Sequence, residues 1–133
     1  MQKAHSNRSQ VKRLRNARID QRPKAKVMFV SVSASKANII LKQIKNKPTD
    51  YACAFLDYDT HHASKIILKV LKSAMANAQN NLNLDPKTLF IEEAYTGRAN
   101  MLRRVRPRAK GRAYGIKKRF CHITLILNEN MGG

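Results

Sequence analysis

The segment from residue 98 to residue 119 constrains the fold of this chain more than any other. It carries ten basic side chains and no acidic one. Because its charges repel and it has little apolar surface to bury, it cannot fold on itself, whereas a polyanion that neutralises it can order it. Pro107 and Gly111, near its middle, are turn residues. The simplest structure is therefore a long ribbon of two strands with a basic tip.

Charge is distributed unevenly along the 133 residues, whose formal net charge is +19. Residues 1–26 hold nine basic groups and one acid, whereas residues 27–97 hold eight basic groups and six acids. A nearly neutral body thus carries two basic appendages. This distribution favours a polyanionic partner, and nucleic acid above all.

Three amphipathic stretches predict helices. The first runs through residue 45 and is expected to be capped by Ser33 or Ser35. The second spans residues 51–58 and is expected to be capped by Thr49 or the following aspartate; the third spans residues 61–80 and is expected to be capped by Thr60. The apolar positions expected to face the core are Ala37, Ile40, Leu41, Ile44, Ala52, Phe55, Leu56, Ala63, Ile67, Val70, Leu71, Ala74 and Ala78.

The remaining regular segments are rich in β-branched and aromatic residues, which favour strands. We expect strands at residues 27–32 and 122–127, and a third that starts at residue 89 and runs on into residues 98–106. Residues 112–119 would run back from the tip. A two-stranded ribbon of this length has no core and is only marginally stable alone in water, so its stability must come from a partner.

No constellation of residues predicts catalysis, a metal site or a cofactor. Cys53 and Cys121 lie far apart and have no metal-ligand spacing. The adjacent histidines at residues 61–62 are expected to mark a helix start. Glu92 and Glu93 are strand neighbours, so they should face opposite sides of the sheet and form no carboxylate pair.

The sequence predicts neither a membrane protein nor a secreted one. The apolar runs are far shorter than the roughly 20 residues that span a bilayer. No apolar region of a secretory signal is present near the N-terminus, although the basic composition there leaves an organellar transit peptide open.

Several motifs resemble those of large-subunit ribosomal protein twenty-two. Residues 107–113 read Pro-Arg-Ala-Lys-Gly-Arg-Ala, and residues 118–124 read Lys-Arg-Phe-Cys-His-Ile-Thr. Residues 70–78, Val-Leu-Lys-Ser-Ala-Met-Ala-Asn-Ala, are similar to a third motif of that family, and residues 32–36 to a fourth. They occur in the family's order. The chain departs from the family at residues 97–100, where Gly-Arg-Ala-Asn replaces Asp-Glu-Gly-Pro, and at residues 120–121, where Phe-Cys replaces Thr-Ser.

The resemblance implies an α+β fold with three helices packed on a small three-stranded antiparallel sheet, a long protruding β-hairpin and a basic N-terminal arm. It implies binding to 23S-type ribosomal RNA (rRNA), a role in subunit assembly, and a hairpin tip that lines the polypeptide exit tunnel. The implied partners are rRNA, neighbouring large-subunit proteins and the nascent polypeptide. Residues 102–104 match a hairpin position that the family links to macrolide resistance.

Together these observations predict a basic N-terminal extension over residues 1–26 and a single ribosomal-protein domain over residues 27–133, with the hairpin at about residues 95–120. The bacterial cytoplasm is the expected location, with an organellar ribosome as the alternative. The alternative function is that of a free-standing basic RNA-binding protein or RNA chaperone. Neither enzyme activity nor a cofactor is expected.

The predicted rRNA-binding residues are mainly cations that contact phosphates. Tyr114 and His122 are candidates for stacking on bases, and packing within the protein is an equal alternative for each. The tunnel tip is predicted to consist of Arg108, Lys110 and Arg112. The complete predicted set is Arg8, Lys12, Arg13, Arg15, Arg18, Arg22, Lys36, Arg98, Arg103, Arg104, Arg106, Arg108, Lys110, Arg112, Tyr114, Lys117, Lys118, Arg119 and His122.

Overall fold

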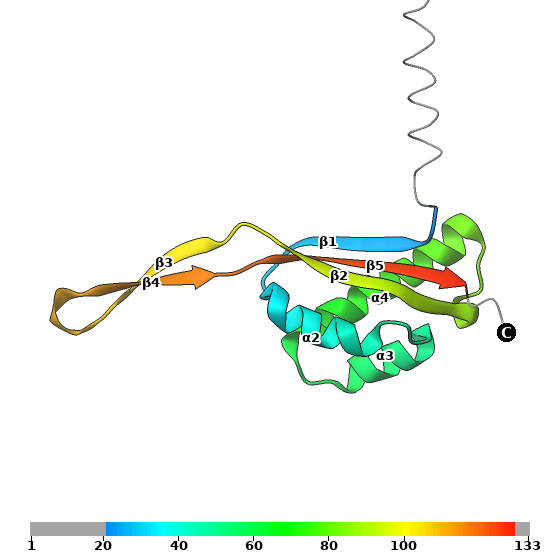
Figure 1. Ribbon diagram of the computed structural model, residues 1–133, viewed down its shortest axis with the longest axis horizontal. Helices are drawn as coiled ribbons and strands as arrows, with labels where there is room; N and C mark the ends of the chain where they lie inside the picture. Colours follow the sequence, from blue (N-terminus) through cyan, green and yellow to red (C-terminus); the bar gives the residue numbers. More distant parts are fainter. Residues whose placement is uncertain (1–20, 130–133) are drawn as a thin grey trace, which may run out of the picture.

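Three helices cover one side of a three-stranded antiparallel sheet, and a separate two-stranded hairpin projects beyond the end of that sheet (Figure 1). The computed structural model describes residues 21–129. The strand order in the larger sheet is β1–β5–β2. The α+β fold class predicted from the sequence is therefore confirmed.

The larger sheet has β5 (Cys121–Glu129) at its centre, between β1 (Lys24–Val30) and β2 (Leu89–Arg98). Alternate residues of β5 face the helices and are fully buried, namely Cys121, Ile123, Leu125 and Leu127. We call the opposite side of this sheet, which the helices do not cover, the outer face. The predicted first strand, residues 27–32, was placed too late, because Lys24 already pairs with Ile126.

Helix α2 (Ala34–Ile44) follows the sequence prediction closely. The hydroxyl oxygen of Ser33 accepts a hydrogen bond from the backbone N–H of Lys36 over 3.4 Å, which satisfies one of the unpaired donors of the first turn. All four positions predicted to be apolar and inward are buried in the core, namely Ala37, Ile40, Leu41 and Ile44.

Two predicted helix caps are wrong. Thr49 lies inside α3 (Thr49–Tyr58), where its buried hydroxyl donates to the carbonyl oxygens of Pro86, at 2.9 Å, and Leu89, at 3.3 Å. The hydroxyl therefore ties α3 to the start of β2 instead of capping its own helix. The residue before α4 (His62–Leu82) is His61, not Thr60, and its side chain makes no capping bond.

The start of α4 is instead held by Asp59. Its carboxylate accepts a hydrogen bond from the hydroxyl of Ser64 and one from the backbone N–H of His61, and it lies 2.5 Å from the Nδ1 atom of the same histidine. These contacts, the one from Ser64 above all, lower the pKa of the Asp59 carboxyl. The helix ends where Asn83 adopts a left-handed conformation with φ of 53°.

Two bulges interrupt the pairing of the larger sheet. In β1 the register with β5 shifts between Val27 and Val30, and Phe29 within the shift has a positive φ of 54°. In β2 the register shifts between Ile91 and Glu93. Each bulge changes which side chains share a face of the sheet.

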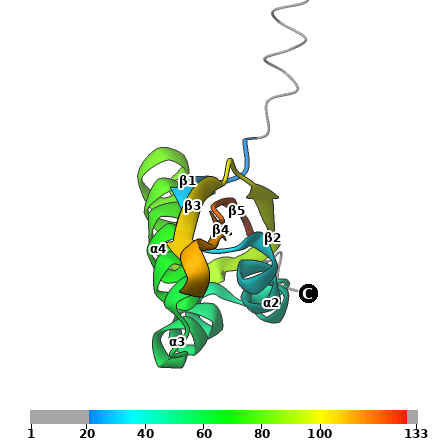
Figure 2. The same ribbon diagram turned by 90° about the vertical axis from the view of Figure 1, so that its left-hand side faces the viewer.

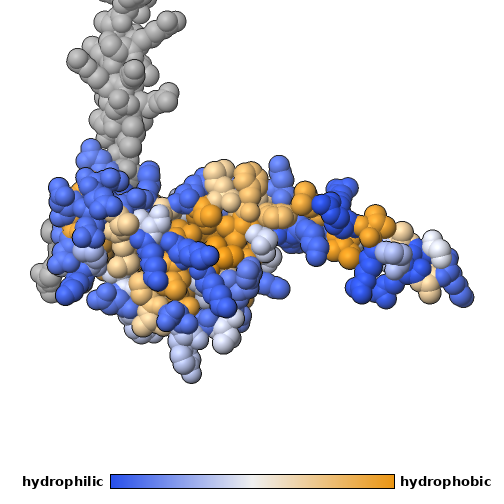
Figure 3. Space-filling model, turned by 180° about the vertical axis from the view of Figure 1, so that it is seen from behind, coloured by the Kyte–Doolittle hydropathy of each residue, from blue (hydrophilic) through white to orange (hydrophobic). Residues whose placement is uncertain are grey.

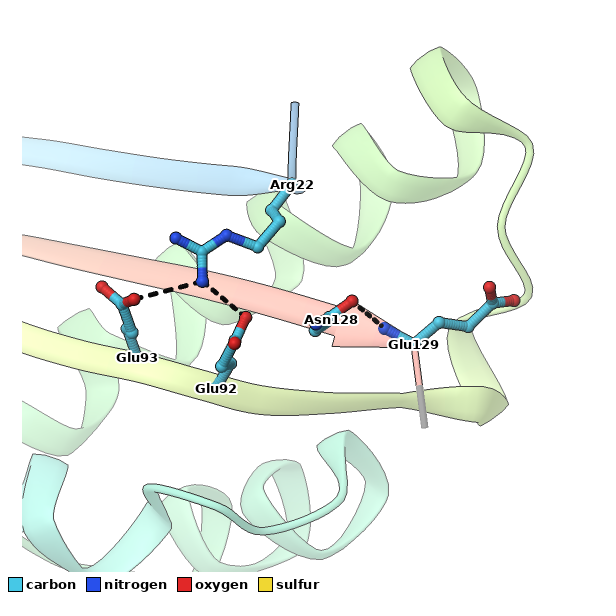
Figure 4. A network of polar contacts seen from close by, with 5 residues as sticks. All are labelled: Arg22, Glu92, Glu93, Asn128 and Glu129. Atoms are coloured by element: carbon cyan, nitrogen blue, oxygen red, sulfur yellow. Dashed lines mark hydrogen bonds and ion pairs between the residues drawn. The ribbon is translucent and has the colours of Figure 1, made fainter. Parts of the chain in front are cut away.

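The bulge in β2 overturns the prediction that Glu92 and Glu93 face opposite sides of the sheet. Both carboxylates contact the Nη1 atom of Arg22, at 2.6 Å and 3.1 Å (Figure 4). A bulge sets two residues of one strand against one residue of its partner, so strict alternation fails there. Arg22 thereby attaches the chain entering β1 to the far edge strand of the sheet.

The hairpin is a structure of its own, consisting of β3 (Leu102–Pro107) and β4 (Ala113–Lys118), which pair only with each other. The expectation that β2 runs on without a break into residues 98–106 is wrong, because residues 99–101 interrupt it. The backbone N–H of Ala99 donates to the carbonyl oxygen of Phe120 over 3.0 Å and joins the two arms at this point.

Candidate nucleic-acid interface

The register of the hairpin gives it two different faces. Residues directly opposite each other in an antiparallel pair lie on the same face, and adjacent residues lie on opposite faces. One face therefore alternates cations with large apolar groups. On the other face, the half nearer the tip holds only small or apolar uncharged residues. The first consists of Leu102, Arg104, Arg106, Tyr114, Ile116 and Lys118; the second of Arg103, Val105, Pro107, Ala113, Gly115 and Lys117.

The tip is a tight turn with two successive left-handed residues, Lys110 with φ of 63° and Gly111 with φ of 68°. The backbone N–H of Arg108 donates to the carbonyl oxygen of Arg112 over 2.8 Å and closes the turn. The guanidinium carbon of Arg108 lies 5.6 Å from the centre of the Tyr114 ring, which is cation–π geometry. All three cations predicted for the tip thus surround one turn.

A hollow at the base of the hairpin joins it to the body. Lys36, in the first turn of α2, lines the hollow opposite cations of the two hairpin strands and of the segment that follows β4. Side chains about 80 residues apart in sequence converge here because the hairpin base passes over the start of α2. The lining residues are Ser31, Ser33, Lys36, Leu102, Arg104, Lys117, Lys118, Arg119 and Phe120.

The cations of the hairpin have no acidic partner in the described part of the chain. Between residues 21 and 129, the ion pairs with a carboxylate are those of Arg22 and His61. Every residue of β3 and β4 except the half-buried Ile116 is exposed. Hydrophilic side chains follow the hairpin to its tip, with apolar patches between them (Figure 3). A bare array of cations on a projecting element can neutralise several phosphates at once.

The predicted cations fall into three groups, two of which the structure describes. Those of the hairpin, with Lys36 and Arg98, lie on the hairpin or at its base, where Arg98 and Arg119 line a second small hollow beside Ser35. Arg22 lies just before β1, against two carboxylates. The remaining predicted cations, Arg8, Lys12, Arg13, Arg15 and Arg18, lie outside the described residues.

The two aromatic candidates have different surroundings. Tyr114 is exposed near the tip beside Arg108. His122 is half-buried on the outer face, where its Nδ1 atom accepts a hydrogen bond from the backbone N–H of Phe29 over 3.1 Å. The two rings meet edge to face with centres 4.8 Å apart. His122 therefore packs against β1 and holds the bulge there.

The sequence analysis missed the outer face of the sheet. Lys24, Lys26, Phe29 and Tyr95 all lie on it, and none was chosen as a site residue. The alternation of Lys24, Ala25 and Lys26 was a usable signal for one exposed and one buried face. No such signal marks the position of Phe29 in the sequence, because its side depends on the bulge in β1.

Other chemistry finds no support between residues 21 and 129. No group of three His, Cys, Asp or Glu residues in that range is arranged to hold a metal ion. No helix described there is both long and apolar enough to cross a membrane. Burial raises the pKa of the Cys121 thiol, and also that of Cys53 despite the opposing charge of Lys72, so neither thiol is activated as a nucleophile.

Comparison with known proteins gives a consistent result. The sequence model of the family described as "Ribosomal protein L22p/L17e" matches residues 25–128. The protein named "Large ribosomal subunit protein uL22" from Lachnospira eligens is 50% identical over 126 residues, which is 95% of this chain and 98% of that protein. The protein of the same name from Lachnoclostridium phytofermentans is 48% identical with the same coverage.

A third relative differs in how much of this chain it matches. The protein named uL22 from Clostridium acetobutylicum is 47% identical over 106 residues, which is 80% of this chain and 96% of that protein. The match to the Lachnospira eligens protein, at 126 of 133 residues, has to extend well into the basic segment that precedes residue 25. That segment is thus shared with some relatives and lies beyond the family model.

Proposed function

Because this chain belongs to the ribosomal protein L22p/L17e family, we propose that it binds 23S-type rRNA in the large ribosomal subunit, aids subunit assembly and lines the exit tunnel with its hairpin tip. The family is one of structural ribosomal proteins, not of enzymes. The relatives named above are bacterial, so the chain is a component of the large subunit in the bacterial cytoplasm.

One observation carries the proposal of rRNA binding. The hairpin and its base, residues 98–119, carry ten cations, and none of them has an acidic partner in the described part of the chain. Both faces of such a ribbon are open to water when the protein is alone. Embedding it in RNA replaces that water with phosphates, and the release of the phosphates' counterions drives binding.

The basic hollow at the hairpin base supports rRNA binding by the body as well. Lys36 and Arg104 reach this hollow from elements far apart in the sequence, so a folded protein presents them together. Contacts of this kind fix the position of a protein on RNA by shape and backbone charge. Neighbouring large-subunit proteins are further proposed partners.

The proposed tunnel role belongs to the turn at residues 108–112, the part farthest from the core along the hairpin (Figure 1). Its closed backbone turn and the contact of Arg108 with Tyr114 support a defined shape at the tip. On the second hairpin face, the uncharged half nearer the tip, around Val105 and Gly115, offers a nascent polypeptide few groups to bind. A nascent chain could pass along this face without being held, and it is therefore a further proposed partner of the tip.

Occupancy in purified ribosomal particles tests this proposal. We expect one copy per large subunit, retained through washes that remove loosely bound proteins. A free-standing RNA-binding protein or RNA chaperone would sediment mostly in the ribosome-free fractions of a sucrose gradient. Absence of the protein from large subunits at stoichiometric level would refute the structural role.

A further inference from the structure

The outer face of the larger sheet is an open surface that the hairpin does not reach. The pairing register assigns two rows of side chains to it, and the hydrogen bond between Phe29 and His122 adds a third row; each row crosses the three strands. No described helix covers this face; Figure 2, which looks along the sheet from the hairpin end, shows the helices on the other side. The rows are Lys24–Ile126–Glu93, Lys26–Thr124–Tyr95 and Phe29–His122–Gly97.

Two large aromatic side chains stand exposed on this face. Phe29 is 59% exposed and Tyr95 is 49% exposed. They belong to the two edge strands, on either side of β5, so they are separated by about 10 Å across the sheet, twice the ordinary strand spacing. Both rings are thus exposed on the same side of the sheet, on neighbouring rows.

The ring of Phe29 is held in place by its surroundings. Its positive φ is unfavourable for a bulky residue, and it persists because the bulge and the hydrogen bond to His122 impose it. The edge-to-face contact with the His122 ring fixes the direction of the Phe29 side chain. A ring ordered in advance loses little conformational freedom when a ligand stacks on it.

The charges around the rings favour an anion. Lys24 and Lys26 are exposed beside them, and the two acids on this side of the sheet, Glu92 and Glu93, are both engaged by Arg22. Gly97 leaves room next to His122, since a Cβ atom placed there would meet no heavy atom within 4 Å. A flat ligand can therefore reach the sheet surface beside His122, whereas Thr124 and Ile126, the central residues of the other two rows, are already buried.

Aromatic rings with adjacent cations on an exposed sheet suit single-stranded RNA. Unpaired bases stack on the rings, and the cations contact the phosphates between them. A protein partner fits less well, because lysine is depleted in the centres of protein–protein interfaces. We propose that the outer face is a second RNA-binding surface, on which Phe29 and Tyr95 stack unpaired bases while Lys24 and Lys26 contact the adjoining phosphates. This inference rests on the proposed rRNA binding and adds a base-stacking surface separate from the hairpin.

The test uses the full chain and deproteinised bacterial large-subunit rRNA. Affinity is measured by filter binding at several salt concentrations, and the reactivity of unpaired bases toward chemical probes is mapped with and without protein. The test variants are Phe29→Leu and Tyr95→Leu. The matched control is Tyr58→Leu, which removes a ring that is 92% exposed on α3, away from the sheet.

Each test variant should weaken binding by roughly 5- to 100-fold, the range expected when one base no longer stacks. A few unpaired bases protected by the unchanged chain should become reactive again with the test variants and stay protected with the control. The slope of affinity against salt should not change, because the test variants keep every cation. Conservative variants that keep a ring, Phe29→Tyr and Tyr95→Phe, should retain the protection.

Folding is controlled by thermal melting and by Phe29→Gly, which suits the left-handed backbone and removes the ring. Equal affinity and equal base protection for the test variants and the unchanged chain would overturn the stacking surface while leaving rRNA binding intact. The stacking surface would also be overturned if particles assembled with a test variant lost a neighbouring protein while the reactivity of the rRNA bases stayed unaltered. That result would assign the face to a protein partner. Failure of the unchanged chain to protect any rRNA base would refute the proposed function itself.

Discussion

Arg22 and Glu92 are 70 positions apart in the sequence, yet the Nη1 atom of one lies 2.6 Å from a carboxylate oxygen of the other. Glu93 contacts the same nitrogen at 3.1 Å. The three side chains are between 31% and 43% exposed, so water and salt screen the attraction. This contact closes the sheet across its outer face, from the start of β1 to β2.

Replacing Arg22 with alanine should lower the free energy of unfolding by at most about 1 kcal/mol, the upper range for partly exposed ion pairs. Urea denaturation in low salt and in roughly 1 M sodium chloride measures the effect, which should shrink in high salt. Lys69→Ala is the matched control, since it removes a cation of α4 that has no ion pair in the described part of the chain. Equal destabilisation by both variants would show that the pair adds no stability.

Neutralising the tip should separate RNA binding from folding. The triple variant Arg108→Ala, Lys110→Ala and Arg112→Ala should melt at the temperature of the unchanged chain, because these residues lie outside the core. The slope of log affinity for rRNA against log salt should fall by roughly 2 to 3 units if all three contact phosphates. Ribosomes carrying this variant should respond differently to macrolides, as measured by inhibition of translation.

A triple variant of the body provides the control for charge: Lys42→Ala, Lys65→Ala and Lys69→Ala removes three cations from α2 and α4. It should leave the macrolide response unchanged. An unaltered macrolide response in the tip variant would count against a tip that lines the tunnel.

Removing residues 1–20 should reduce the salt dependence of RNA binding and spare the fold. Cutting there keeps Arg22 and the whole of β1, whereas a cut after residue 26 would delete part of a paired strand. Each phosphate that the shortened chain no longer neutralises lowers the slope by roughly 0.7 to 0.9 units. The comparison is made by filter binding with rRNA, and a slope identical to that of the full chain would mean that this segment binds no phosphate.

Two adjacent isoleucines of α2 give a direct test of the core. Ile40 is 5% exposed and packs in the core, whereas Ile39 is 62% exposed. Ile40→Ala should lower the free energy of unfolding by about 2–5 kcal/mol, since it leaves a cavity. Ile39→Ala should change it by no more than about 0.5 kcal/mol. Urea denaturation of both variants measures the difference, and similar values would contradict the placement of this helix.

The contacts of Asp59 should make stability depend on pH. Because its folded pKa is lowered, its contribution is present above the unfolded pKa of about 3.9 and is lost as the pH falls through the folded pKa. Asp59→Asn should therefore lower the free energy of unfolding near neutral pH. The difference in this free energy between the variant and the unchanged chain, measured by urea denaturation at several pH values, should narrow in acid. Asp57→Asn is the matched control, since it removes a carboxylate two positions earlier that makes no side-chain hydrogen bond within residues 21–129.

Much of the fold could be predicted from local patterns. The spacing of apolar residues from Ala37 to Ile44 specifies which side of α2 is buried, because a helix repeats every 3.6 residues whatever surrounds it. The same holds for the buried face of α4. Thr49 was wrong as a cap because its hydroxyl bonds to Pro86 and Leu89, which belong to a distant segment. Thr60 was wrong because α4 starts one residue later than expected and the carboxylate of Asp59 holds its first turn.

The candidate site could be predicted only where charge alone defines it. The hairpin cations were evident because no acid occurs between residues 98 and 119. The hollow at the hairpin base was not evident as a unit, since Lys36 and Lys118 meet only after the strands and α2 have packed. The rRNA-binding roles of single residues stay predictions until the experiments above are done.

The sequence by itself determined the separation of a nearly neutral body from basic segments, the faces of the helices and the existence of a ribbon with a turn near Gly111. These follow from composition and short-range periodicity. Only the tertiary structure decided the two bulges. One places the carboxylates of Glu92 and Glu93 on the same side of the sheet, and the other turns the ring of Phe29 outward over His122. A bulge changes the pairing of one strand relative to another, and that register is a property of the assembled sheet and not of either strand alone.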